Sequence, residues 1–290
     1  MTATTLTPIA EGRLARAVRL SLVHFRFQFI EILRTPIAVI GNLAFPAIAL
    51  LFFVVPQAAV AQHPVAATSA TAQLAAFAIA STCMFTFGLG VSEERSKPFA
   101  PYQRTLPVGV LPPLAGRVLN GIVWSYIALV PLVVVGWLGT SAELDPARIL
   151  PALVTVIGIA TPFTLLGLAI GYAMSPKAAV AVVQLTLFPL AFAGGMFMPP
   201  EIFPGWLDAM SSFTPTRAVR EVFVATAAGT PLDAKFVIVL LGWIVLFATL
   251  ATIAYRRDEG VAVVELGKIA HVRRHGEQVE QSGRRTRDEG

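Results

Sequence analysis

The sequence contains few charged residues: Asp, Glu, Lys and Arg make up 13% of its 290 residues, about half the share found in soluble proteins. No Asp, Glu, Lys or Arg occurs between Pro36 and Val91 or between Val118 and Ala142. The chain is 56% hydrophobic, with a mean hydropathy of +0.72. A soluble domain of this size could not bury that much apolar surface. The composition therefore predicts an all-α integral membrane protein with several spans.

Other absences limit the chemistry. Cys83 is the only cysteine, so an internal disulfide is excluded. The segment Leu266-Gly267-Lys268 lacks the glycine-rich run and the Ser or Thr of a phosphate-binding loop. The histidines show no metal-ligand spacing, and no Ser/His/Asp set converges on one predicted surface; they are His24, His63, His271 and His275. We therefore expect no catalytic, cofactor or metal site on this chain, and a transport protein rather than an enzyme.

The apolar runs predict six transmembrane helices, each near the ~20 residues that cross a bilayer. They cover about 36–55, 72–91, 118–139, 149–173, 178–197 and 235–255. Residues 56–71 would form a short outer loop. Apart from Lys235 at the start of the last span, no Asp, Glu, Lys, Arg or His falls inside these spans, whereas ion-coupled transporters generally carry such groups at membrane depth. This absence disfavours an ion-coupled secondary transporter, while a membrane-anchored scaffold stays open.

Residues 13–34 form an amphipathic pattern, with a phenylalanine-rich face and a basic face, which suits a helix in the membrane interface. The alternative is the start of a long first span. With both termini in the cytoplasm, only four of the 22 Lys and Arg residues lie outside: Arg148, Arg217, Arg220 and Lys235. This bias accounts for the net charge of +5 without a nucleic-acid partner. The predicted parts are a cytoplasmic N-terminus (1–35), a permease domain (36–257) and a polar cytoplasmic tail (258–290).

The charged, proline-rich segment 92–117 interrupts the apolar runs and must lie in water at one membrane face. It reads Glu93-Glu94-Arg95, then Tyr102-Gln103-Arg104-Thr105-Leu106-Pro107, then Gly116-Arg117. With six spans, an N-terminal basic helix and this loop, the chain resembles the type-2 ABC-transporter permease family, in particular daunorubicin-resistance-type membrane subunits. The resemblance implies a coupling loop that contacts a nucleotide-binding subunit. The expected coupling residues are Glu93, Glu94, Arg95, Tyr102, Arg104, Thr105, Leu106 and Pro107. The alternative is a plain charged turn between spans.

The second and more specific part of the resemblance begins at the end of span five and continues into residues 198–234, the expected outer re-entrant segment. Its motif runs from Gly194-Gly195-Met196-Phe197-Met198-Pro199-Pro200 through Trp206-Leu207 to Phe213-Thr214-Pro215. The family places short re-entrant helices between spans five and six, and such half-helices need protein or a water cavity to cover them. The implied outer gate comprises Met196, Met198, Pro200, Phe203, Trp206 and Leu207. For the methionines, ordinary packing is the alternative. A disordered outer loop is the alternative for the whole segment.

The resemblance implies half of an ATP-driven exporter for an apolar or amphipathic molecule, such as a drug-like natural product or a lipid. A separate ATPase subunit would bind ATP and Mg, and a second permease copy or paralogue would complete a dimer in the cytoplasmic membrane, in contact with membrane lipid. Export of a glycan or lipid-linked polymer is the alternative within the family.

Overall fold

The computed structural model describes residues 13–34, 36–97 and 111–258. Within these residues the chain is helical and forms no strand. The helices are α1 (Arg13–Leu33), α2 (Pro36–Phe53), α3 (Ala58–Ala61), α4 (Pro64–Ser96), α6 (Leu111–Gly139), α7 (Pro146–Ala173), α8 (Pro176–Ala193), the 3₁₀ helix η1 (Pro200–Ile202), α9 (Gly205–Ser211), α10 (Pro215–Ala228) and a last helix, Ala234–Asp258. The all-α prediction is confirmed.

Proline fixes where several helices start. Pro64, Pro146, Pro176 and Pro215 each occupy the first helical position, where the missing N–H costs no helical hydrogen bond. The Asp145 side chain accepts a hydrogen bond from the Ala147 N–H at 2.9 Å and caps α7. These signals set the helix boundaries independently of tertiary packing.

Five helices among the described residues are long and apolar enough to cross a membrane: α4, α6 from Pro112, α7, α8 and the last helix. The predicted first span corresponds to α2, in which Leu43–Phe53 forms a shorter apolar helix. The chain is therefore a multi-pass membrane protein, and the count of six spans stays a prediction.

Two predicted boundaries are wrong. The expected outer loop 56–71 is largely helical, because α3 lies within it and α4 begins at Pro64. The third span was expected from Val118, but α6 begins at Leu111, because prolines are tolerated in a first helical turn. Helix therefore extends into the predicted coupling loop 92–117 from both sides. Within this loop, only residues 98–110 lie outside the described residues.

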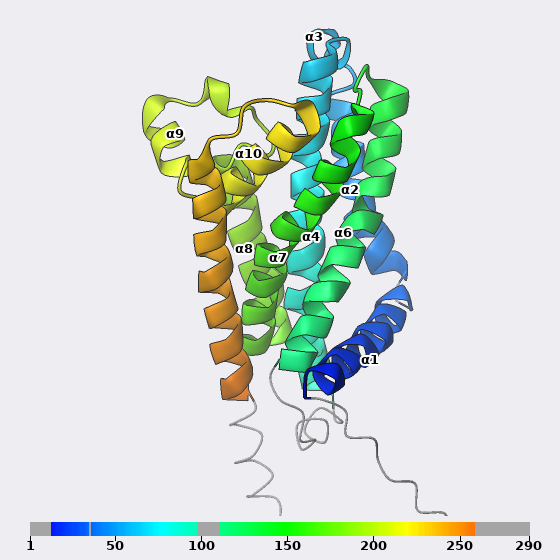
Figure 1. Cartoon of the computed structure of the whole chain (residues 1–290), viewed down its shortest axis with the longest axis vertical. Helices are drawn as coiled ribbons and strands as arrows, with labels where there is room; N and C mark the ends of the chain where they lie inside the picture. Colours follow the sequence, from blue (N-terminus) through cyan, green and yellow to red (C-terminus); the bar gives the residue numbers. More distant parts are fainter. Residues whose placement is uncertain (1–12, 35, 98–110, 259–290) are drawn as a thin grey trace, which may run out of the picture.

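α4 is the central helix of the bundle (Figure 1). It contacts α2, α6, α7, α8 and α10, and its Phe77, Ile79 and Met84 are completely buried. α1 lies obliquely across one end of the bundle, where the last helix also ends, and α9 and α10 lie at the other end (Figure 1). We call these the α1 end and the α9 end.

Candidate functional site

Ion pairs and a hydrogen bond to a carbonyl join five helices at the α1 end. Arg117 of α6 donates to Glu94 Oε2 of α4 at 2.6 Å. Arg95 of α4 donates through Nε to Asp258 Oδ1 of the last helix at 2.7 Å, and through Nη1 to the Gly171 carbonyl of α7 at 2.9 Å. The last turn of α4 is thereby fixed to three other helices. We call Glu31, Glu94, Arg95, Lys97, Arg117 and Asp258 the α1-end cluster.

Lys97 extends this cluster to α1. Its Nζ donates to Glu31 Oε1 at 2.8 Å, and this hydrogen bond is the main reason that the pKa of Lys97 is raised. Both side chains are at least half exposed, so the pair contributes at most ~1 kcal/mol. Lys97 is also the last described residue before segment 98–110. The contact between Lys97 and Glu31 therefore joins the end of α4 that precedes this segment to α1.

α1 packs closely against α6 rather than lying apart from the bundle. A Cβ added at Gly116 would lie 2.9 Å from the Ser21 carbonyl oxygen, so only glycine permits this approach. Asn120 of α6 donates through Nδ2 to the Phe25 carbonyl of α1 at 3.0 Å. Burial, with Arg117 as the second cause, lowers the pKa of His24 in this contact. The predicted amphipathic helix is confirmed as a helix, and its packing makes it part of the α1-end assembly.

The predicted coupling residues divide into two groups. Tyr102, Arg104, Thr105, Leu106 and Pro107 lie outside the described residues. Glu93, Glu94 and Arg95 occupy the last turns of α4, where Glu94 and Arg95 take part in the α1-end cluster. Glu93 is exposed and, among the described residues, lies in no ion pair. Of the three, it is the one whose charge is available to a ligand or partner.

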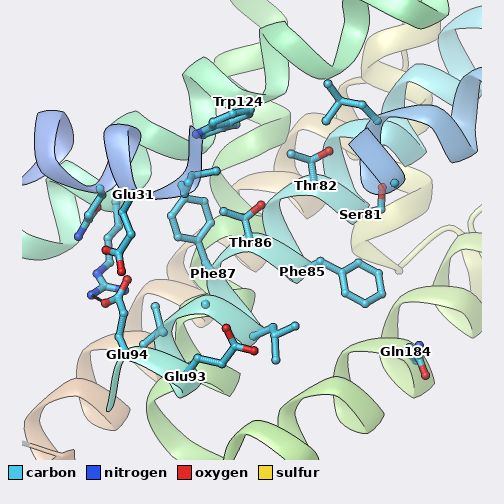
Figure 2. A pocket seen from close by; sticks show the side chains of 18 of the residues that line it. Glu31, Ser81, Thr82, Phe85, Thr86, Phe87, Glu93, Glu94, Trp124 and Gln184 are labelled. Carbon is cyan, nitrogen blue, oxygen red and sulfur yellow. Dashed lines mark hydrogen bonds and ion pairs between the residues drawn. The ribbon is translucent and has the colours of Figure 1, made fainter. Parts of the chain in front are cut away.

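A cavity of ≈ 580 Å³ lies between α1, α2, α4, α6 and α8. Figure 2 shows its wall on α4, from Ser81 and Thr82 to Glu93 and Glu94 at the α1 end. Aromatic side chains supply most of the apolar lining: Phe45, Phe77, Phe85, Phe87, Trp124 and Phe188. The cavity is of the size and character of a small-molecule site. Sequence reasoning missed it, because five helices that are distant in the chain form it.

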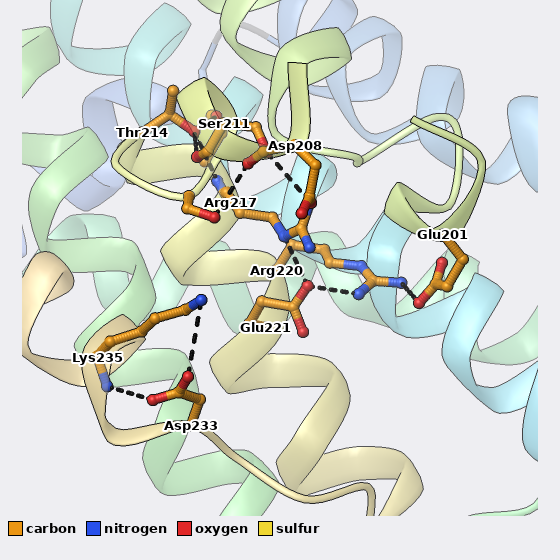
Figure 3. Close-up of polar contacts among 11 residues, drawn as sticks. Glu201, Asp208, Ser211, Thr214, Arg217, Arg220, Glu221, Asp233 and Lys235 are labelled. Carbon is orange, nitrogen blue, oxygen red and sulfur yellow. Dashed lines mark hydrogen bonds and ion pairs between the residues drawn. The ribbon is translucent and has the colours of Figure 1, made fainter. Parts of the chain in front are cut away.

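At the α9 end, α10 carries two buried arginines (Figure 3). Glu221 Oε1 pairs with Arg217 Nε and with Arg220 Nη1, each at 2.7 Å. Arg217 also contacts Asp208 of α9 at 3.1 Å. The burial of both arginines was missed, although the i,i+4 spacing of Arg217 and Glu221 was a usable signal.

The predicted outer-gate residues differ in burial. Met196 and Pro200 are buried, and the ring of Phe197, beside Met196, lies 4.6 Å from that of Phe77 of α4, tilted by 53°. Phe203 and Leu207 are half-buried. Met198 and Trp206 are exposed, Trp206 to 67%. This distribution suits ordinary packing for Met196, and the gate role of the set stays a prediction.

The disordered-loop alternative for residues 198–234 is excluded over this stretch, because η1, α9 and α10 form there. Thr214 Oγ1 accepts from the Arg217 N–H at 3.2 Å and caps α10. Thr216 Oγ1 donates to the Leu190 carbonyl of α8 at 2.5 Å.

Within the described residues, no group of three or more His, Cys, Asp or Glu side chains is placed to hold a metal ion.

Comparison with known proteins gives one family match and two relatives. The model of the ABC-2 type transporter family matches residues 21–228. A Bacillus subtilis (strain 168) protein named as transport permease YvfS is 22% identical over 185 residues, which cover 64% of this chain and 76% of YvfS. The daunorubicin resistance ABC transporter permease protein DrrB1 of Streptomyces coeruleorubidus is 29% identical over 160 residues, which cover 53% of this chain and 56% of DrrB1.

Proposed function

Since this chain belongs to the ABC-2 type transporter family and is a permease subunit of an ABC transporter, we propose that it forms half of an ATP-driven exporter. The exporter moves an apolar or amphipathic molecule, such as a drug-like natural product or a lipid, out of the cell. ATP and Mg bind to a separate ATPase subunit. A second permease copy or paralogue completes the pathway in the cytoplasmic membrane.

One observation carries this proposal: the same helix lines the cavity and leads into the predicted coupling loop. α4 supplies cavity residues from Phe77 to Lys97, and segment 98–110 follows directly. The α1-end cluster links the last turn of α4 to α1, α6, α7 and the last helix. A displacement of the loop by an ATPase would thus reach the cavity wall through one rigid helix and would bias its open and closed states.

Two further observations support a small apolar or amphipathic cargo. The cavity lining is mainly aromatic and aliphatic, and DrrB1 is named for resistance to a drug. A glycan polymer would need a continuous polar path, whereas the charged lining residues lie at the α1 end and the rest of the lining offers only scattered hydroxyl and amide groups. The predicted spans also lack the ionisable groups that ion coupling generally uses.

The energy source gives the first test. The purified chain is expected to hydrolyse no ATP, because it has no phosphate-binding loop. Cells that express it with an adjacent-gene ATPase should export dansylcadaverine, a fluorescent aromatic amine, after a protonophore collapses the proton gradient, provided that ATP is maintained. Efflux would be followed by fluorescence. Efflux that stops with the gradient at constant ATP would contradict the exporter proposal and favour the secondary transporter.

The second test concerns coupling. We propose that residues 102–106 bind the ATPase through Tyr102 and Leu106, which are four apart and would share a helical face. Leu106→Asp should weaken binding by ~2 kcal/mol or more if this side chain is an interface anchor. Leu144→Asp is the matched control, since Leu144 is 44% exposed in the loop between α6 and α7. Co-purification of the ATPase is the measurement. If Leu106→Asp retains as much ATPase as Leu144→Asp, the binding site lies elsewhere.

A further inference from the structure

The cavity beside α4 contains polar atoms that nothing in the described part of the chain satisfies. The Thr82 hydroxyl and the Trp124 indole N–H are buried without a hydrogen-bond partner there, and both residues line the cavity. The two residues are only 1% and 2% exposed. A buried polar group without a partner costs ~1–3 kcal/mol. A polar group of a ligand would recover that cost once the side chains around these two atoms open to admit it.

The mouth of the cavity at the α1 end carries an excess of negative charge. Its ionised lining residues are three carboxylates, Glu31, Glu93 and Glu94, and two cations, Lys97 and Arg117. Lys97 pairs with Glu31 and Arg117 pairs with Glu94, which leaves the Glu93 carboxylate without an ion pair among the described groups, although Lys97 also attracts it at longer range. In Figure 2 Glu93 is directed away from Glu31 and Glu94, on the side that faces Gln184 of α8.

The aromatic lining between these two regions also favours a cation. Ring faces attract organic cations, by ~0.5–2 kcal/mol depending on how far the cation is desolvated. Thr82 and Glu93 are eleven positions apart on one helix, about 16 Å at a rise of 1.5 Å per residue. A ring system with a short amine tail spans that separation.

We propose that this cavity binds the cargo and selects an amphipathic cation, with its amine at Glu93 and its ring system among the aromatic side chains near Trp124 and Thr82. The identification of the ligand as cargo rests on the proposed exporter function. Binding of the ligand to the cavity requires no ATPase. Glu93 sets the charge preference, and Thr82 and Trp124 hold a polar group on the ring system.

A pair of probes that differ only in charge tests the preference. The full chain would be placed in phosphatidylcholine nanodiscs and titrated with dansylcadaverine, an aromatic ring system with an amine tail, and with its N-acetylated neutral form. Fluorescence against empty nanodiscs reports binding. We expect the amine to bind about fivefold or more tightly than the acetylated form, the effect of one partly exposed charge pair. Equal affinity of the two probes would overturn the proposal without the need for any variant.

Variants locate the effect. Glu93→Gln should weaken binding of the amine by about fivefold and leave the acetylated probe unchanged. Glu143→Gln is the matched control, because Glu143 is exposed in the loop between α6 and α7, and it should change neither probe. Trp124→Phe keeps a ring but removes the N–H, and should weaken both probes alike. An amine affinity in Glu93→Gln equal to that in Glu143→Gln would refute the role of Glu93.

The two proposals fail separately. The nanodisc measurement uses no ATPase. If the amine binds more tightly than the acetylated probe but efflux does not depend on ATP, the exporter proposal is refuted and the cation site is retained. ATP-driven efflux in cells together with equal affinity for both probes would refute the cation site and leave the exporter standing.

Discussion

Replacement of Glu221 by Gln should lower the free energy of unfolding by about 3 kcal/mol, because it removes the shared partner of two buried charges. Arg217 Nε and Arg220 Nη1 both lie 2.7 Å from Glu221 Oε1. The arginine side chains are 11% and 5% exposed, so water cannot replace the lost carboxylate. The two buried guanidinium groups would keep only the more exposed carboxylates of Asp208 and Glu201, at 3.1 and 3.8 Å, and the cost of this incomplete pairing exceeds what the pair contributes when it is complete.

Glu201→Gln is the control for this variant. Glu201 also faces Arg220, but at 3.8 Å and with a side chain that is 70% exposed, so its loss should cost well under 1 kcal/mol. Cys83 supplies the measurement, since it is the only cysteine and is completely buried. A thiol-reactive dye would label it as the bundle opens on heating. Equal labelling temperatures for the two variants would show that Glu221 does not hold α10 in place.

Two ion pairs, one at each end of the bundle, show which interactions can be predicted from the sequence. The pair of Arg217 and Glu221 lies within one helix, so its spacing is visible in the sequence. The pair of Arg95 and Asp258 joins residues 163 positions apart, and no local pattern connects them. The sequence placed both residues near one membrane face through the distribution of basic residues, but only packing brings Nε and Oδ1 to 2.7 Å.

The helices were predictable to the extent that local chemistry determines them. Apolar length predicted the long helices, and prolines marked starts such as those of α8 and α10. The extra length of α4 was missed, because hydropathy reports the apolar part of a helix and not its polar turns, which run on to Ser96. The cavity could not be predicted from the sequence for another reason. Its lining comes from helices whose relative rotation depends on tertiary contacts.

Replacement of Gly171 by Val should separate the two most extensively packed helices of the bundle. Gly167 and Gly171 of α7 are four positions apart, a spacing that allows two helices to approach closely, and the structure shows that the partner is α4. A Cβ at Gly171 would lie 2.5 Å from the Phe87 carbonyl oxygen and 2.8 Å from Val91 Cβ. The backbone of α4 cannot move away from one residue alone, so the helices must part.

The expected loss is about 3 kcal/mol, at the upper end of the usual cost of overpacking, because the nearest atom belongs to a backbone rather than to a flexible side chain. A functional loss should accompany it, since the Gly171 carbonyl also accepts from Arg95 Nη1 at 2.9 Å. Displacement of α7 would break this contact at the end of α4 that leads to the predicted coupling loop.

Gly158→Val is the matched control for Gly171→Val. It makes the same change in the same helix, at a position where an added Cβ meets nothing within 4 Å. Both variants would be compared by thermal labelling of Cys83 and by ATP-dependent efflux of dansylcadaverine. We expect Gly158→Val to match the wild-type chain in both measurements, and Gly171→Val to label at lower temperature and to lose efflux. If the two variants behave alike, α4 and α7 do not approach each other at Gly171 as the structure shows.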